Sequence, residues 1–167
     1  MSRALKDLHP IVRAKTEALL QLCIEKKIKI IITQTLRSAE EQAAFYARGR
    51  KPLATVNALY AKAGLAPITD KENKSIITKA ATIENSFHGY GLAIDFAVLG
   101  LDGKTILWDP NKDLDNDGVS EYHEVAKLAE SLGFEAGINW SSMPDAPHLQ
   151  MRFGLTLADL KAGKRPK

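Results

Sequence analysis

Cysteine and long apolar runs are nearly absent from this chain of 167 residues. Cys23 is the only cysteine, so no disulfide can form within the chain, and synthesis in a reducing compartment is expected. No segment approaches the roughly 20 consecutive apolar residues that a membrane-spanning helix requires, and we expect no stable membrane insertion. The amino-terminal segment also has no apolar region typical of an export signal, which predicts synthesis in the cytoplasm without a signal peptide.

A large charge imbalance is also absent. Lysine and arginine number 23, aspartate and glutamate number 20, and the formal net charge is +3. This small excess of positive charge does not indicate nucleic-acid binding, because nucleic-acid-binding proteins typically have a strongly basic face. The length fits one domain with its own apolar core, so we interpret residues 1–167 as a single domain and expect a monomer.

Hydrophobic periodicity predicts a mixture of helices and strands. Pro10 stands at a first helical position, and Ser38 with Glu41 forms the capping-box pattern that begins a second helix. Runs rich in β-branched residues or short and apolar predict strands, and Asp102-Gly103 predicts a hairpin. We expect helices over 10–23, 38–49 and 122–132, strands over 28–35, 92–98, 105–108 and 148–153, and a short final helix after Thr156. Helices beside an antiparallel-rich sheet make a small α+β domain.

Four side chains in two short motifs carry the clearest chemical signal. His88 and Asp95 lie in Ser-Phe-His-Gly-Tyr-Gly-Leu-Ala-Ile-Asp, and Asp145 and His148 lie in Pro-Asp-Ala-Pro-His near the carboxyl end. A charge such as Asp95 inside an apolar strand needs a partner, and a metal ion is one. Two imidazoles and one carboxylate, with a second carboxylate left over, fit a hydrolytic zinc site that keeps one position for water. The alternative is that His88 is a hydrogen-bonded loop residue and Asp95 a strand-end cap.

These motifs resemble the zinc peptidases of the D-alanyl-D-alanine carboxypeptidase, or VanY-like, group. The resemblance is closest to the L-alanyl-D-glutamate endopeptidases that phages use as endolysins. It extends over most of the chain, because Leu36-Arg37-Ser38-Ala39-Glu40-Glu41-Gln42 is similar to the group's Arg-Ser-x-x-Glu-Gln motif and residues 133–151 are similar to its closing block. The resemblance implies a zinc-binding fold of the Hedgehog and D,D-peptidase type.

The resemblance also implies a role for each residue of the two motifs. His88, Asp95 and His148 match the zinc ligands of the group. Asp145 matches the catalytic carboxylate, which activates water and returns the proton to the leaving amine. The expected cofactor is therefore zinc, held by three side chains, with one further carboxylate beside it.

Arg37 matches an arginine that lies beside the substrate in the group. Its forked donors and fixed charge suit a peptide carboxylate or a developing oxyanion. The alternative is a surface ion pair between Arg37 and Glu40 or Glu41. The other positions expected around the substrate are Gln42, Ser86 and Trp140.

The sequence departs from the group in two places. The group's closing block usually contains a run similar to Trp-Gly-Gly-Asp-Trp, whereas Ala136-Gly137-Ile138-Asn139-Trp140 keeps one glycine and one tryptophan. Residues 51–81 form a segment longer than expected, with apolar and alanine-rich stretches. We interpret that segment as an insertion, such as a helical lid, or as a partner surface.

A second metal site is predicted between the two zinc motifs. Asp113-Leu114-Asp115-Asn116-Asp117-Gly118, followed after five more residues by Glu124, matches an EF-hand calcium loop over 113–124. The expected ligands are the carboxylates of Asp113, Asp115, Asp117 and Glu124 and the carbonyl of Val119. No helix is predicted to enter the loop, so only its exiting helix is EF-hand-like. The alternative is an acidic turn without metal.

We therefore expect a zinc metallopeptidase that cuts the L-alanyl-D-glutamate bond of peptidoglycan stem peptides, with calcium activation as a further hypothesis. Two alternatives stay open. One is a D,D-carboxypeptidase or dipeptidase acting on terminal D-alanyl-D-alanine, and the other is a non-catalytic envelope-binding module that holds zinc and calcium structurally. As a phage enzyme, the chain would be made in the host cytoplasm and reach the wall after holin-type release.

Overall fold

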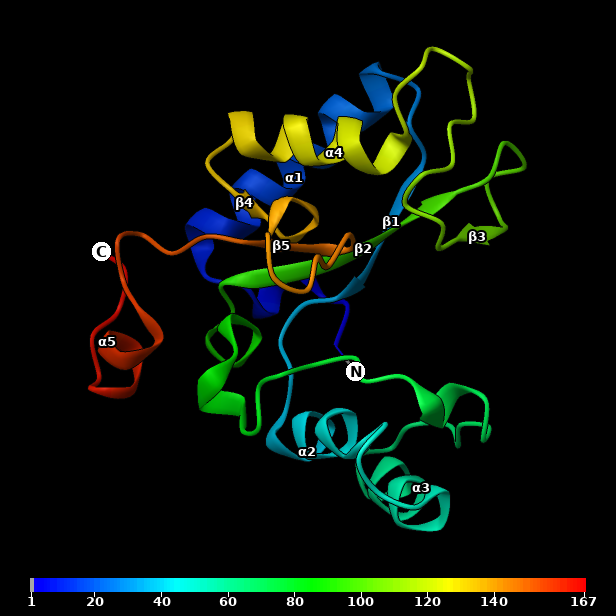
Figure 1. The fold of residues 1–167 in the computed structure, drawn as a ribbon. Helices are drawn as coiled ribbons and strands as arrows, with labels where there is room; N and C mark the ends of the chain where they lie inside the picture. The colour runs from blue at the N-terminus through cyan, green and yellow to red at the C-terminus, as the bar shows by residue number, and fades with distance from the viewer. Residues whose placement is uncertain (1) are drawn as a thin grey trace.

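The computed structural model describes residues 2–167, and an antiparallel sheet lies at its centre (Figure 1). The strands run in the order β1-β2-β5-β4, and β3 pairs with the carboxyl end of β2. Their bounds are β1 Ile30–Gln34, β2 Ala93–Leu99, β3 Ile106–Leu107, β4 Glu135–Ala136 and β5 His148–Gln150. All four strand pairings are antiparallel, so the predicted α+β architecture is confirmed.

Two helices cover one face of the sheet and enclose the main core. α1 (Pro10–Glu25) and α4 (Glu121–Ser131) lie side by side over β2 and β5 (Figure 1). The buried residues of this core come from both helices and the sheet, and include Val12, Leu19, Phe96, Tyr122 and Leu149. Within the described residues, no helix is long and apolar enough to cross a membrane.

A second, smaller apolar cluster lies apart from the main core. It joins α2 (Ala39–Ala47) to α3 (Leu53–Lys62), which stand on the side of the sheet away from α1 and α4 in Figure 1. Its buried members are Ala44, Ala47, Val56 and Tyr60. The capping box that begins α2 is confirmed, because Ser38 and Glu41 each accept a backbone hydrogen bond from the other. The 51–81 segment therefore contains one helix, and its identity as an insertion or lid stays a prediction.

The remaining elements are short. They are the 3-10 turns η1 Leu5–Asp7, η2 Glu72–Lys74, η3 Ile83–Asn85, η4 Phe87–Tyr90 and η5 Gly137–Asn139, and the final helix α5 Leu157–Lys161. Thr156 caps α5 as predicted, through a reciprocal pair of bonds with Asp159. The last strand is shorter than the predicted 148–153, because Phe153 and Gly154 both adopt left-handed backbone (φ 53° and 71°) and turn the chain away from the sheet.

Strand register brings the distant sequence motifs together. Asp95 on β2 is the register partner of His148 on β5, so the two motifs meet at adjacent positions of the sheet. On the other side of β2, Gln34 pairs with Asp95 across an irregularity between Ile32 and Gln34. Arg37 lies between the end of β1 and the start of α2, which is the strand-to-helix corner expected from the sequence.

Candidate metal and catalytic site

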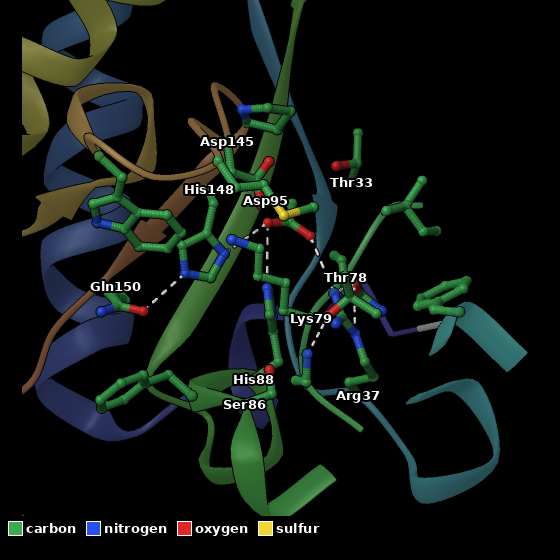
Figure 2. Close-up of a pocket in the computed structure, with 18 of the residues that line it drawn as sticks. Thr33, Arg37, Thr78, Lys79, Ser86, His88, Asp95, Asp145, His148 and Gln150 are labelled. Atoms are coloured by element: carbon green, nitrogen blue, oxygen red, sulfur yellow. Dashed lines mark hydrogen bonds and ion pairs between the residues drawn. The ribbon is translucent and has the colours of Figure 1, made fainter. Parts of the chain in front are cut away.

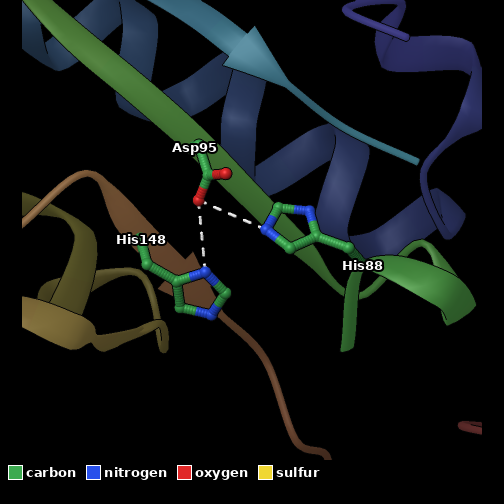
Figure 3. A group of neighbouring side chains, drawn as sticks. All are labelled: His88, Asp95 and His148. Carbon is green, nitrogen blue, oxygen red and sulfur yellow. Dashed lines mark hydrogen bonds and ion pairs between the residues drawn. The ribbon is translucent and has the colours of Figure 1, made fainter. Parts of the chain in front are cut away.

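His88, Asp95 and His148 form a compact group of metal-ligating atoms (Figure 3). Their ligand atoms all lie within 4.8 Å of one another. Asp95 Oδ1 is 3.2 Å from His88 Nε2 and 3.2 Å from His148 Nδ1. His88 comes from η4, Asp95 from β2 and His148 from β5, so three separate elements converge on one point.

In each imidazole one ring nitrogen faces Asp95 and the other makes a hydrogen bond on the outer side. The outer hydrogen bond fixes the orientation of the ring. His88 Nδ1 donates to the carbonyl oxygen of Thr35 at 2.7 Å, and His148 Nε2 donates to Gln150 Oε1 at 3.0 Å. In these neutral tautomers the near nitrogens are both lone-pair acceptors that face a carboxylate oxygen. A cation placed among these three acceptors would be bound by all of them, and outer hydrogen bonds of this kind are typical of metal-binding histidines. The donor set and its protonation therefore fit zinc.

Burial and mutual charge set the pKa values of the three groups. Burial lowers the pKa of His88, partly opposed by Asp95. Burial alone would raise the pKa of Asp95, but the two histidines outweigh it and hold that pKa well below its usual value. Burial also acts to lower the pKa of His148, yet Asp95 raises it overall. The negative charge of Asp95 therefore favours positive charge at this point of the site.

Asp145 lines the same cleft as these three side chains (Figure 2). Burial raises its pKa, and the nearby charge of Asp95 raises it further. Its backbone is fixed: Asp145 N–H donates to Gly137 O at 2.9 Å, and His148 N–H donates to Asp145 O at 3.1 Å. A Cβ atom on Gly137 would lie 2.5 Å from Asp145 O, so glycine is required at this close approach. The carboxylate is therefore held near the histidines in a state that accepts a proton more readily than an exposed aspartate.

Arg37 is a partly buried cation on the opposite side of the site from Gln150 (Figure 2). Its side chain is 10% exposed and its Nη2 lies 3.5 Å from Asp95 Oδ2, so the structure does not place it in a surface ion pair. Nε and Nη2 donate to Gln34 Oε1, and Nη1 donates to Gln42 Oε1 at 3.0 Å. Burial lowers the pKa of Arg37, with Asp95 as the main opposing charge.

The other predicted substrate residues occupy different positions. Ser86 and Trp140 line the cleft, and the Trp140 ring centroid is 5.2 Å from that of His148. Gln42 is fully buried and does not line the cleft; it bonds Arg37 and the carbonyl oxygen of Ala80 instead. Its position suits a role in orienting Arg37.

Sequence reasoning missed several side chains that support the site. Gln34 anchors Arg37, and Gln150 anchors His148. Glu135 accepts from Trp140 Nε1 at 2.7 Å and pairs with Arg152 at 2.6 Å. Their polarity in otherwise apolar strands was the available signal, since buried polar side chains need partners. The cleft has a volume of about 810 Å³ and is lined by residues from both ends of the chain.

The acidic loop has a different construction from the zinc site. The carboxylates of Asp113, Asp115 and Asp117 offer oxygens within 4.8 Å of one another. Backbone N–H groups of the loop already hold them, including Gly118 N–H to Asp113 Oδ2 at 3.0 Å. Val119 follows on the exposed surface.

Two carboxylates from α4 also belong to the loop segment, and each has one buried oxygen without a partner. Glu124 Oε2 is buried without a hydrogen-bond partner, and burial raises the pKa of Glu124, with Asp117 adding to the rise. Glu121 is 5% exposed, and its Oε1 accepts from Leu114 N–H at 2.8 Å while its Oε2 has no partner. Glu121 stands at the ninth position of the loop, where EF-hands often carry a water-mediated ligand. The sequence analysis did not assign it.

Comparison with known proteins supplies relatives for this chain. The family model described as D-alanyl-D-alanine carboxypeptidase matches residues 79–151. The peptidoglycan L-alanyl-D-glutamate endopeptidase CwlK of Bacillus subtilis is 40% identical over 145 residues, which span 87% of this chain and 74% of that protein. The L-alanyl-D-glutamate peptidase of Listeria phage A118 is 28% identical over 155 residues, spanning 91% of this chain but 42% of the phage protein.

One solved structure is similar over nearly the whole chain. The L-Ala D-Glu endopeptidase ChiX of Serratia marcescens is 19% identical, with a TM-score of 0.49. The match covers 93% of this chain and 86% of the Serratia chain.

Proposed function

Because this chain belongs to the D-alanyl-D-alanine carboxypeptidase family of metallopeptidases, we propose that it is a zinc-dependent endopeptidase of bacterial peptidoglycan. The bond we propose is L-alanyl-D-glutamate, which the names of the Bacillus and Listeria phage relatives specify. The observation that carries the proposal is the convergence of His88, Asp95 and His148, with Asp145 in the same cleft.

We assign each residue of the cleft a separate role in the reaction. His88, Asp95 and His148 would hold zinc, which when bound lowers the pKa of water and polarises a carbonyl. Asp145, whose pKa burial raises, takes the proton from the attacking water and passes it to the leaving amine. Arg37, held by Gln34 beside Asp95, offers positive charge to the oxygen on which negative charge develops.

Digestion of purified peptidoglycan by the zinc-loaded protein tests this function. Mass spectrometry of the products should find new D-glutamyl amino termini and stem fragments that end in L-alanine. Release of terminal D-alanine alone would favour a D,D-carboxypeptidase, the activity that the matching family model names. Full zinc content without any cleavage would favour an envelope-binding module.

We also propose that the 113–124 loop binds calcium. The acidic triplet is supported by the unpaired, buried Oε2 atoms of Glu121 and Glu124, which lack any partner in the described structure. A divalent cation would supply the missing partner for both. The calcium ligands we propose are Asp113, Asp115, Asp117, Glu124 and the carbonyl of Val119, with Glu121 as an added participant. Calorimetric titration of the zinc-loaded protein with calcium measures the binding directly.

For localisation, we propose action on the cell wall after synthesis in a bacterial cytoplasm. The Listeria phage relative supports a phage enzyme that acts on the cell wall, and the route that we propose to the wall is holin-type release. Phage lysis assays with and without a co-expressed holin test this route: lysis that requires the holin supports it, and lysis by the enzyme alone contradicts it.

A further inference from the structure

Five cationic side chains line the catalytic cleft, but three of them are already bound to other groups. Arg37 bonds Gln34, Gln42 and Asp95, and Arg152 pairs with Glu135. Arg48 donates to the carbonyl oxygen of Glu72. The remaining two, Arg3 and Lys79, donate to neither a carboxylate nor a carbonyl oxygen in residues 2–167.

Lys79 lies on the side of the cleft that carries Asp145. Its Nζ donates to Ser142 Oγ at 3.1 Å, and Ser142 precedes Asp145 by three residues in the same loop. Lys79 and Thr78 are drawn near Arg37 in Figure 2, among the residues of the pocket that holds His88 and His148. A neutral hydroxyl is a weak partner for an ammonium group, so Lys79 can exchange it for an anion.

The segment that carries Lys79 is fixed on both sides of it. Arg50 Nη2 donates to Thr78 O at 2.9 Å, and Gln42 Nε2 donates to Ala80 O at 2.5 Å. Because Gln42 also holds Arg37, the backbone beside Lys79 is tied to the cation next to the metal site. Lys79 therefore extends from an anchored backbone, although its own side chain is exposed.

Arg3 lines the cleft from the amino-terminal segment. The adjoining Ser2 carbonyl accepts from Thr35 N–H at 2.9 Å, and the Thr35 carbonyl oxygen in turn bonds His88. Arg3 thus follows a residue attached next to β1, and it has no hydrogen bond to the loop of Asp145 in residues 2–167.

The proposed substrate requires a cation on the leaving-group side. A D-glutamyl residue has two carboxyl groups and only one can continue the peptide, so the other is a free carboxylate unless it is amidated. In an L-alanyl-D-glutamate bond this residue supplies the leaving amine, which takes its proton from Asp145. The free carboxylate consequently lies close to the loop of Asp145, and a low-dielectric cleft without a partner for it would disfavour binding.

We propose that Lys79 is a specificity-determining residue, whose ammonium group leaves Ser142 and binds the free carboxylate of the D-glutamyl residue on the leaving side of the scissile bond. This inference rests on the proposed function and names the substrate class: stem peptides whose D-glutamate is not amidated. The exposed Lys79 becomes covered by the substrate, which strengthens the charge pair relative to one in bulk water.

A matched pair of substrates tests the inference. One is a synthetic stem peptide with a free D-glutamyl carboxylate, and the other has that carboxylate amidated. We expect the zinc-loaded wild type to prefer the acid in kcat/KM, and Lys79→Gln to lose about tenfold or more on the acid with little change on the amide. Lys79→Arg should keep the preference. An equal loss on both substrates, or a preference unchanged in Lys79→Gln, would overturn the inference.

Arg3→Gln is the control, since it removes the same charge from the same cleft. Its acid preference should match that of the wild type, and loss of the preference here instead would assign the carboxylate to Arg3. Calorimetric binding of both peptides to Asp145→Asn, with and without Lys79→Gln, separates this inference from the proposed function. A Lys79-dependent preference in binding without hydrolysis by the wild type would keep the subsite and refute the endopeptidase; equal binding of acid and amide would refute the subsite.

Discussion

The zinc-type centre and the acidic loop are both groups of carboxylate and polar ligands, yet they are built in different ways. In the centre, register partners on β2 and β5 aim the ligands, and the far nitrogen of each histidine is bonded. In the loop, the aspartates are half-buried or exposed and bond their own backbone, while Glu121 and Glu124 keep unpaired buried oxygens. We therefore expect the centre to be preformed for a cation, and we expect the loop to depend on one for its final arrangement.

The largest expected effect comes from removing the base of the centre. Asp145→Asn should reduce peptidoglycan hydrolysis by about 10²–10⁴-fold, because the amide cannot take the proton of the attacking water. Zinc content and melting temperature should stay near those of the wild type, since Asp145 is outside the group of three ligands. Turnover and zinc content should be measured on the same sample. Activity retained at full zinc content would show that Asp145 is not the base.

The next effect tests the outer hydrogen bonds of the centre. Gln150→Leu removes the acceptor of His148 Nε2 and should weaken zinc binding by about 10–100-fold. Competition with a chelator of known affinity measures the change. Gln21→Leu is the matched control, because Gln21 is exposed on α1 and bonds only Glu25 in the described structure. Equal zinc affinity in the two variants would contradict a preformed centre.

Calcium should act on the loop rather than on the centre. At calcium about 100-fold above its dissociation constant, the melting temperature of the wild type should rise by roughly 5–10 °C. Asp113→Ala plus Asp115→Ala should abolish that rise and any calcium-dependent activity, while zinc content is kept. The charge-matched control is Glu17→Ala plus Asp70→Ala, two exposed acids that each pair with a basic residue four positions away. A calcium response in the double loop variant equal to that of the control would rule out this site.

A smaller effect, on stability at high pH and on thiol labelling, should appear at Cys23. This residue lies on α1 near α4, the helix that follows the acidic loop. Burial, with a contribution from Glu124, raises the pKa of this thiol to about 12. The folded state therefore favours the thiol, so its stability should be unaffected at neutral pH and fall as pH rises from about 9 towards 12. Labelling of the Cys23 thiol at pH 8 should require local unfolding that exposes it. Calcium should slow this labelling in the wild type but not in Asp113→Ala plus Asp115→Ala. Fast labelling of the folded protein would contradict the burial of Cys23.

The contrast also explains what the sequence could and could not predict. The pairing of Asp95 with His148 followed from an apolar strand interrupted by one charge and a second strand beginning at a histidine, and the structure places them opposite each other. The helix beginning at Ser38 followed from local capping chemistry. The capping signal is contained within a few residues, and each of the two strands is also marked by its own short segment, so the elements could be predicted without the fold.

The roles of residues whose partners are distant in the chain could not be predicted from the sequence. Gln34 and Gln150 acquire their importance only because β1 and β5 flank β2, which brings Arg37 and His148 beside them. Lys79 lay in the segment interpreted as an insertion, and only the folded chain shows that it reaches the loop of Asp145. A surface lysine is indistinguishable in sequence from one that borders a cleft.

The small apolar cluster between α2 and α3 has a consequence for how this molecule opens. This cluster contains far fewer buried residues than the core between the sheet and helices α1 and α4, so this unit should unfold on its own at a lower free energy than the whole domain. Backbone amides of α3 would then exchange with solvent deuterium long before that of Phe96, which sits in the central strand. Since α2 supplies Gln42, which holds both Arg37 and Ala80, such an opening would release substrate-facing groups while leaving the metal ligands in place. We therefore expect substitutions within this cluster to change how firmly Arg37 and the backbone beside Lys79 are held, with little effect on the stability of the metal-binding sheet.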